Sequence, residues 1–278
     1  MTTKYLIVPL LLALLALPSS AAEDVDKYIQ NLNDPDAEVR WVAASTLGSL
    51  GDRKAVDPLM TALKDNLRVG QAAAWSLGEL GDAKAVGVLI QMLQSIDGYE
   101  DDTEAQIRAA AAGALGKLNS SLAIDPLIQA LLDEKSDVRA AAAESLGRQG
   151  DPKAVEPLIL SLGDDSYSVR INALWSLQKI ADNRSTEPLI LSLMDEDARV
   201  RLAAAKILGD LGDARAVSSL IRALEDADVD VRGSAAEALG KLGDTRAVEP
   251  LKEALNDDNA AVKLQATWAL EKLGVPAQ

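Results

Sequence analysis

Apolar residues recur along most of the chain with the period of an α-helix. Each copy of the pattern is centred on a Val or Ile, here called the anchor residue, and in every copy Ala follows four positions later and Leu eight positions later. On a helical wheel these positions lie within about 80° of one another, so each copy predicts a helix with one buried stripe. The eight anchor residues are Val39, Val69, Ile107, Val138, Val169, Val200, Val231 and Val262.

A second, shorter helix is predicted after each of these anchor helices. Gly or Asn marks the end of most anchor helices, because a left-handed residue commonly terminates an α-helix. Asp usually follows, and the next helix carries the pattern Val-x-Pro-Leu, as in Val155 to Leu158. Since Val25 to Leu32 match this second pattern as well, the chain holds eight helix pairs. The anchor helices are expected to begin near residues 37, 67, 105, 136, 167, 198, 229 and 260.

The repeated unit resembles the HEAT-like repeats of the phycobilin lyase family. The likeness extends over residues 23–278 and is carried by motifs such as Asp137-Val138-Arg139, Leu146-Gly147, Gly150-Asp151 and Val155-Glu156-Pro157-Leu158. It implies an all-α fold, a right-handed α-solenoid in which eight HEAT-like helix pairs form a single array. It also implies that the anchor helices line the concave side of the solenoid.

Composition narrows the chemistry that this chain can perform. The chain is 48% hydrophobic but only 3% aromatic, and it contains no Cys, His or Phe. Disulfides, thiolate nucleophiles, histidine bases and metals held by Cys or His are therefore excluded. Deoxyhypusine hydroxylases resemble this architecture but place His-Glu pairs around two irons, so their activity does not carry over. We expect a non-catalytic protein with no cofactor and no metal site.

The charge balance is acidic, with 28 Lys and Arg residues against 43 Asp and Glu residues and a net charge of −15. Binding to nucleic acid requires Lys and Arg to neutralise phosphates, so this balance argues against a nucleic-acid partner. It also disfavours attachment to an anionic membrane surface.

Residues 1–22 have the features of a secretory signal peptide. Lys4 supplies a positive start, an apolar stretch runs from Tyr5 to Leu17, and small residues lead to Ala21 and Ala22. The apolar stretch is shorter than the roughly 18–20 residues that a membrane helix requires. We therefore expect an exported protein, periplasmic or extracellular, with no stable membrane insertion after cleavage. The alternative interpretation is an uncleaved N-terminal anchor.

Two further repeated positions have structural interpretations. Arg follows most anchor residues, and we interpret it as a bridge to the Asp residues of adjacent repeats rather than as a row of anion-binding sites. Gly stands nine positions after most anchors, where it is expected to let neighbouring helices pack closely. The fifth unit has Gln178 at that position and Ala181 where the helix-ending Gly is expected. This departure predicts a local irregularity of the array.

An acidic insertion interrupts the regular spacing between Val69 and the next anchor. It covers residues 95–104 and includes five acidic residues around Gly98. Oxygen ligands of this kind suit calcium, but the spacing does not match the EF-hand loop. We interpret the insertion as a solvated acidic loop, with a calcium site as the alternative.

Large apolar residues occupy anchor-helix positions that lie opposite the buried stripe, where a free-standing solenoid would carry polar residues. Trp and Tyr dominate binding hot spots, and apolar residues on a solvated face are typical of interaction sites. We therefore predict that they form a binding face centred on Trp175. The alternative is that the Trp side chains only stabilise the array. The candidate residues are Trp41, Leu67, Trp75, Tyr167, Ile171, Trp175, Leu202, Val229, Leu264 and Trp268.

Three functions remain open at this point. The first is an exported scaffold that binds a protein partner on its concave face. The second, which the family resemblance implies, is a protein that handles a bilin or another tetrapyrrole in the manner of a lyase. The third is an assembly factor for a secreted or membrane complex.

Overall fold

The computed structural model describes residues 21–95 and 102–276, and within these ranges the chain is helical and contains no strand. The longer helices are the anchor helices predicted from the sequence. Only α6 begins noticeably before its expected start. The anchor helices are α2 (Ala37–Leu50), α4 (Leu67–Leu80), α6 (Asp102–Leu118), α8 (Ser136–Gln149), α10 (Tyr167–Ile180), α12 (Ala198–Leu211), α14 (Val229–Leu242) and α16 (Ala260–Lys272).

The shorter helices alternate with the anchor helices and are here called the outer helices. They are α1 (Ala21–Asn31), α3 (Val56–Ala62), α5 (Val86–Gln94), α7 (Ile124–Ala130), α9 (Val155–Ser161), α11 (Thr186–Leu191), α13 (Val217–Ala223) and α15 (Val248–Ala254). A single 3₁₀ turn precedes each outer helix from α3 onwards, and another extends α11. These turns are η1 (Arg53–Ala55), η2 (Ala83–Ala85), η3 (Ser121–Ala123), η4 (Pro152–Ala154), η5 (Asn183–Ser185), η6 (Ser192–Met194), η7 (Ala214–Ala216) and η8 (Thr245–Ala247).

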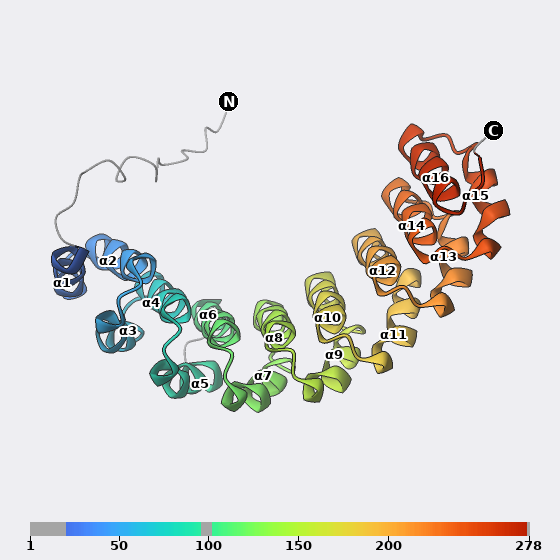
Figure 1. The fold of residues 1–278 in the computed structure, drawn as a ribbon. Helices are drawn as coiled ribbons and strands as arrows, with labels where there is room; N and C mark the ends of the chain where they lie inside the picture. Colours follow the sequence, from blue (N-terminus) through green and yellow to red (C-terminus); the bar gives the residue numbers. More distant parts are fainter. Residues whose placement is uncertain (1–20, 96–101, 277–278) are drawn as a thin grey trace, which may run out of the picture.

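Successive helix pairs stack side by side into an open arc (Figure 1). The anchor helices lie on the inner, concave side of the arc, and the outer helices from α3 to α15 lie on the convex side. The expected all-α solenoid of HEAT-like pairs is therefore confirmed, together with the expected position of the anchor helices.

The buried stripe of the anchor helices forms the core between the two layers. Every Ala four positions after an anchor and every Leu eight positions after it is fully buried, as Ala142 and Leu146 illustrate. From the outer layer, residues such as Val155 and Leu158 of α9 complete the same core. The core thus runs continuously along the array, as the period of the sequence predicts.

The turns between the two helices of a unit use the predicted residues. Gly150, for example, ends α8 in the left-handed conformation with φ 69°, and the Asp151 side chain then accepts a hydrogen bond from the Lys153 backbone N–H. Two non-glycine residues adopt the same left-handed conformation, Asn119 with φ 49° and Ala181 with φ 54°. Ala181 is therefore a strained end to α10.

A ladder of Arg–Asp pairs connects successive turns along one edge of the solenoid. Arg139 donates from Nε and Nη2 to the two carboxylate oxygens of Asp164, at 2.7 and 2.8 Å, and from Nη1 to the Asp133 carbonyl at 2.9 Å. Arg139 therefore joins the turn before its own helix to the turn before the next anchor helix, which confirms the bridging interpretation. Arg40, Arg170, Arg201 and Arg232 make the same two contacts. The other rungs are Arg40–Asp65, Arg108–Asp133, Arg170–Asp195, Arg201–Asp226 and Arg232–Asp257.

Small residues let the anchor helices approach one another closely. A Cβ atom placed on Gly48 would lie 2.7 Å from the Ser76 Cα atom of the next anchor helix, so this Gly is required by the packing. The buried Ser76 hydroxyl donates to the Ala44 carbonyl at 2.6 Å. Because a Gly faces a Ser or Ala at most of these junctions, the helix spacing stays regular.

The junction between α10 and α12 departs from this pattern. Gln178 replaces the Gly, the buried Ile207 replaces the small residue opposite, and the buried Leu174 replaces an Ala. The larger side chains keep the helices apart, and α10 packs less extensively against α12 than other neighbouring anchor helices pack against each other. At the same junction Arg170 reaches Asp195 through Nη2 alone, and its buried Nε lacks a hydrogen-bond partner. The predicted irregularity is therefore present.

Candidate binding face

In the C-terminal half of each anchor helix, packing leaves two positions for the concave face. The buried stripe faces the outer helices, and the positions five, seven and nine residues after the anchor face neighbouring anchor helices. On a helical wheel the positions six and ten residues after the anchor lie away from both contacts, at about 240° and 280°. The residues at these positions, here called the concave positions, are exposed or half-buried without exception.

Two Trp side chains are exposed at concave positions. Trp75 of α4 is 43% exposed and Trp175 of α10 is 38% exposed. Both stand six residues after their anchors, and α6 and α8 lie between them along the arc (Figure 1). The concave residues between the two Trp positions include Gly113 and Glu144.

The remaining predicted residues occupy three regions and differ in exposure. Tyr167 and Leu264 are exposed, at 40% and 67%. Trp41, Leu67, Ile171, Leu202, Val229 and Trp268 are half-buried. The array brings Tyr167, Ile171, Trp175 and Leu202 together on α10 and α12. It places Trp41, Leu67 and Trp75 nearer the N-terminal end and Val229, Leu264 and Trp268 nearer the C-terminal end.

Cations cover most of the aromatic rings on this face. The Arg68 guanidinium carbon lies 3.8 Å from the centroid of the Trp41 ring, and that of Arg199 lies 3.5 Å from the Tyr167 ring. The ammonium groups of Lys117 and Lys272 lie 5.0 and 5.4 Å from the rings of Trp75 and Trp268, respectively. Such contacts stabilise the array and occupy the rings.

Trp175 differs from the other three Trp residues. No cation of the described chain lies over its ring, although its exposure is close to that of Trp75. Its indole is therefore the one most available for another molecule.

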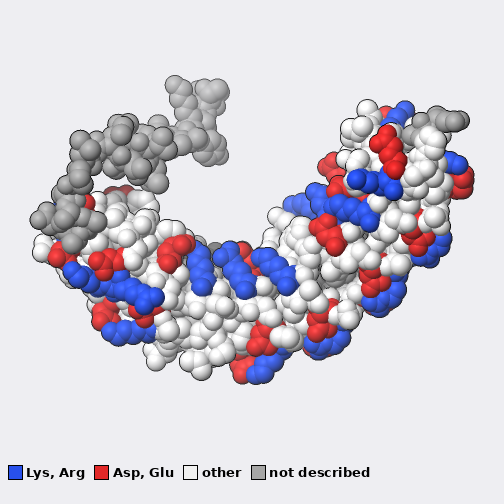
Figure 2. Space-filling view, in the orientation of Figure 1, with Lys and Arg blue, Asp and Glu red and all other residues white. Residues whose placement is uncertain are grey.

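Charge is unevenly distributed over the surface. Figure 2 shows basic side chains in a row along the inner edge at the middle of the arc, and pairs of acidic and basic side chains along the outer edge. The outer pairs include Lys84 with Asp57 and Arg184 with Glu156.

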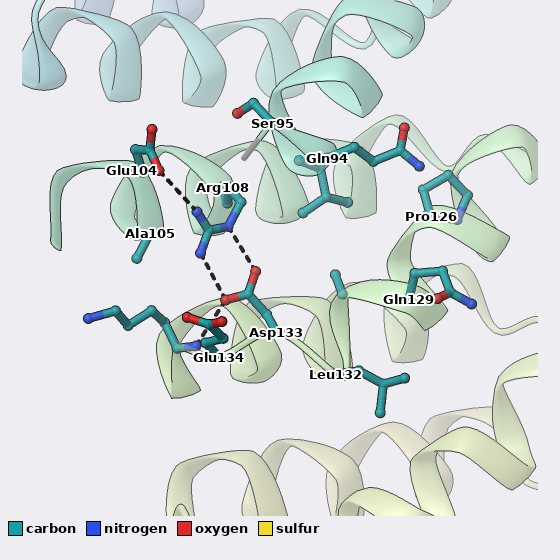
Figure 3. Close-up of a pocket in the computed structure, with 13 residues that line it drawn as sticks. Gln94, Ser95, Glu104, Ala105, Arg108, Pro126, Gln129, Leu132, Asp133 and Glu134 are labelled. Atoms are coloured by element: carbon teal, nitrogen blue, oxygen red, sulfur yellow. Dashed lines mark hydrogen bonds and ion pairs between the residues drawn. The ribbon is translucent and has the colours of Figure 1, made fainter. Parts of the chain in front are cut away.

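A cavity of about 690 Å³ lies beside the ladder at Arg108. Figure 3 shows the Arg108 guanidinium between the carboxylates of Glu104 and Asp133, and the Arg108 Nε donates to Asp133 at 2.8 Å. The cavity is thus built around the Arg108–Asp133 rung of the ladder, whose two charges neutralise one another, with Glu104 beside it. Ser95, on its wall, is the first residue of the acidic insertion, most of which lies outside the described residues.

Neither a metal site nor a membrane span is found in the described part of the chain. No group of His, Cys, Asp or Glu residues there could hold a metal ion, and no helix is both long and apolar enough to cross a bilayer. The predicted signal peptide lies almost entirely outside the described residues.

The outer layer carries an apolar surface that the sequence analysis missed. Leu160 of α9 and Leu191 of α11 are 80% and 68% exposed at equivalent positions, where α3, α7, α13 and α15 have Thr, Gln, Arg and Glu. Leu132, just after α7, and Met194, just after α11, extend this surface, which therefore covers the units of α7, α9 and α11. The change from polar to apolar residues at one repeat position was the signal that could have revealed it.

Comparison with known proteins identifies the repeats. The family of HEAT repeats matches residues 25–100, 96–178, 137–194, 155–232 and 186–271, which is most of the chain. Among curated proteins no sequence matches.

Several solved structures are similar to this chain. YibA of Escherichia coli shares 22% identity, and the match covers 93% of this chain and 98% of that one with a TM-score of 0.63. A chain in the complex of Kap95p with RanGDP shares 15% identity over 91% of this chain and 40% of its own, with a TM-score of 0.62. The CpcE–CpcF phycocyanin lyase of Nostoc sp. shares 25% identity, covering 96% and 91% of the two chains, with a TM-score of 0.43. The repeat match and the helix-pair architecture together show that the chain belongs to the HEAT-repeat family.

Proposed function

We propose that this protein is an exported, non-catalytic scaffold that binds a segment of a partner protein on its concave face. The observation that carries the proposal is the exposed Trp175 ring at a concave position in the middle of the arc, without a cation over it. Exposing part of a Trp side chain to water forfeits burial of a large apolar surface, whereas a partner that covers it recovers that free energy.

Gly113 gives independent support for close approach by a partner. It lies within α6 at a concave position, and a Cβ atom placed on it would meet no atom within 4 Å. Gly within a helix costs about 0.5–1 kcal/mol relative to Ala, and internal packing does not require it here. A partner backbone passing over α6 supplies a reason for its presence.

Export is the second element of the proposal and rests on residues 1–22. N-terminal sequencing of the native protein should begin near Ala22 or Glu23. A native protein that retains Met1 and is recovered from the cytoplasm would contradict export without affecting the binding proposal.

The binding face is tested by site-specific photo-cross-linking in the source organism. A benzoylphenylalanine at position 175 should cross-link to a partner, and one at the exposed Leu160 of the convex layer serves as the matched control. Cross-links from position 160 and none from position 175 would show that the convex surface binds and that the proposal is wrong.

Two substitutions separate binding from stability. Trp175→Ala should weaken partner capture with little change in thermal stability. Gly113→Leu should weaken capture by filling the concave face, while the free energy of unfolding stays equal or rises because Leu is the better helix former. If Trp175→Ala lowers stability by several kcal/mol and leaves capture intact, the Trp serves the fold instead.

A further inference from the structure

We infer that the concave surface around Trp175 receives an acidic segment of the partner, with carboxylates paired to Lys179 and Lys206 and an apolar side chain placed on the indole. This inference rests on the proposed function and specifies the chemistry of the partner. Three observations on charge carry it.

The first observation is the charge of the two helices at this junction. The helices α2, α4, α6, α8 and α14 each carry equal numbers of acidic and basic residues. By contrast α10 carries Arg170 and Lys179 with no acidic residue, and α12 carries three basic residues with Asp210 as its single acid. Arg170, Arg199 and Arg201 are paired with Asp195, Asp197 and Asp226 of the turns. The positive charge that α10 and α12 leave unpaired is therefore that of Lys179 and Lys206.

The second observation is that the basic residues at the other concave positions already have partners. Lys117 pairs with Glu79, Arg148 with Glu144 at 2.5 Å, and Lys241 with Asp210 at 2.8 Å. Lys272 lies over the Trp268 ring. These cations contribute to the fold and are largely neutralised.

The third observation is that Lys179 and Lys206 lack such partners. Both are exposed at concave positions, and neither has a hydrogen bond, ion pair or ring contact with any described residue. Lys179 stands one helical turn after Trp175 on α10, so their Cβ atoms are about 5–6 Å apart. Lys206 occupies on α12 the repeat position that Trp175 occupies on α10. One free ammonium group therefore lies along α10 from the indole, and the other lies across the junction on α12.

The net negative charge of the chain does not prevent an acidic segment from binding here. The nearest concave carboxylates, Glu144 and Asp210, are paired with Arg148 and Lys241. More distant carboxylates are screened, because the Debye length is about 8 Å at physiological ionic strength. A segment is favoured over a small molecule because the surface is open, and small ligands bind tightly when a pocket buries most of their area. Trp175 does not line the 690 Å³ cavity beside Arg108.

Defined peptides test this inference on the full chain. The probe is a fluorescein-labelled peptide of alternating Glu and Leu with a central Phe, about 10 residues long and able to extend over roughly 30 Å. Its counterpart has Lys at every Glu position, and affinities are measured by fluorescence anisotropy at low and high salt. We expect the acidic peptide to bind about tenfold more tightly than the basic one, with the difference decreasing as salt rises.

Charge variants identify the lysines responsible. Lys179→Gln combined with Lys206→Gln should weaken binding of the acidic peptide about tenfold. The matched control, Lys117→Gln combined with Lys241→Gln, removes two neutralised cations from the same face and should change affinity less than about twofold. Equal binding of the two peptides, or unchanged binding by the Lys179/Lys206 variant, would overturn the inference.

Biliverdin, a tetrapyrrole dicarboxylate, tests whether the site binds a small molecule instead of a peptide. If biliverdin binds with a visible absorbance change and the acidic peptide does not bind, the site takes a small molecule and the inference is wrong. The cross-linking experiment at position 175 distinguishes failure of the acidic-partner inference from failure of the proposed function. Protein cross-links that are indifferent to Lys179 and Lys206 retain the proposed function and remove only the acidic partner, whereas an absence of cross-links removes both.

Discussion

Gly209 of α12 packs directly against Ala238 of α14, and a Cβ atom placed on the Gly would lie 2.8 Å from both the Cα and the Cβ atoms of Ala238. The nearest obstacle includes backbone, which cannot move aside without separating the two helices. Gly209→Ala should therefore lower the free energy of unfolding by about 1–3 kcal/mol through overpacking. Chemical denaturation measures the change.

Gly233 provides the matched control on α14. A Cβ atom placed there meets no atom within 4 Å, so Gly233→Ala should stabilise the protein by about 0.5–1 kcal/mol because Ala is the better helix former. If both substitutions change stability in the same direction, close approach of the anchor helices does not explain the repeated Gly.

Leu177 tests the buried stripe on which the fold prediction depends. The side chain is fully buried, whereas Leu160 on the convex surface is 80% exposed. Leu177→Ala should lower the free energy of unfolding by about 2–5 kcal/mol, as truncations of buried Leu residues do. Leu160→Ala should change it by no more than about 0.5 kcal/mol. Thermal and chemical unfolding of the two variants give the comparison, and equal losses would contradict the core assignment.

The fold could be predicted from the sequence because the anchors, Ala at +4 and Leu at +8 repeat in every unit. Helical geometry converts that spacing directly into a buried stripe, so Leu146 and Leu177 could be placed in the core without coordinates. The turn residues were equally predictable, because Gly and Asp have specific roles at helix ends.

The candidate site was less predictable because its properties depend on pairs of side chains from different repeats. Trp75, Trp175 and Trp268 occupy the same position of the repeat, yet only Trp175 is without a cation over its ring in the described chain. The partner of Lys117 is Glu79, which lies on the preceding anchor helix. The helical period gives the face of each residue but not these contacts between helices, so the distinct chemistry around Trp175 emerged only from the structure.

The Arg–Asp ladder should be sensitive to replacement of Arg by Lys. In the pair of Arg139 and Asp164, two nitrogens of one guanidinium engage both carboxylate oxygens, and the side chains are 13% and 11% exposed. A Lys ammonium cannot reproduce this bidentate geometry. Arg139→Lys should lower the free energy of unfolding by about 1–3 kcal/mol. Arg184→Lys on the exposed convex edge should have little effect, and equal losses would argue against a structural role for the ladder.

Acid should weaken the ladder. The hydrogen bond from Arg40 lowers the pKa of Asp65 below its ordinary value of 3.8, and those from Arg201 and Arg232 do the same to the pKa values of Asp226 and Asp257. Because each folded-state pKa is depressed, the stabilisation is complete above about pH 4 and is lost as pH falls through the folded-state values. The free energy of unfolding, measured by denaturation, should be constant from pH 7 to about pH 4 and should decline from there to pH 2. A decline that begins near neutral pH would contradict this origin.

Ala181 is the one left-handed Ala among the described residues, and it ends α10 with φ 54°, where α8, α12 and α14 end in Gly. A Cβ atom in this conformation crowds the backbone, and Gly removes that strain while gaining some conformational freedom in the unfolded chain. The net effect of Ala181→Gly should be stabilisation by about 0.5–1 kcal/mol. Gly212 ends α12 with φ 72°, and a Cβ atom placed on it would meet no atom within 4 Å. The reverse change, Gly212→Ala, should therefore destabilise the protein by about 1 kcal/mol through backbone strain alone. Urea denaturation of both variants measures the pair. If both substitutions destabilise the protein, packing of the Ala181 side chain at the α10–α12 junction contributes more free energy than its backbone strain costs.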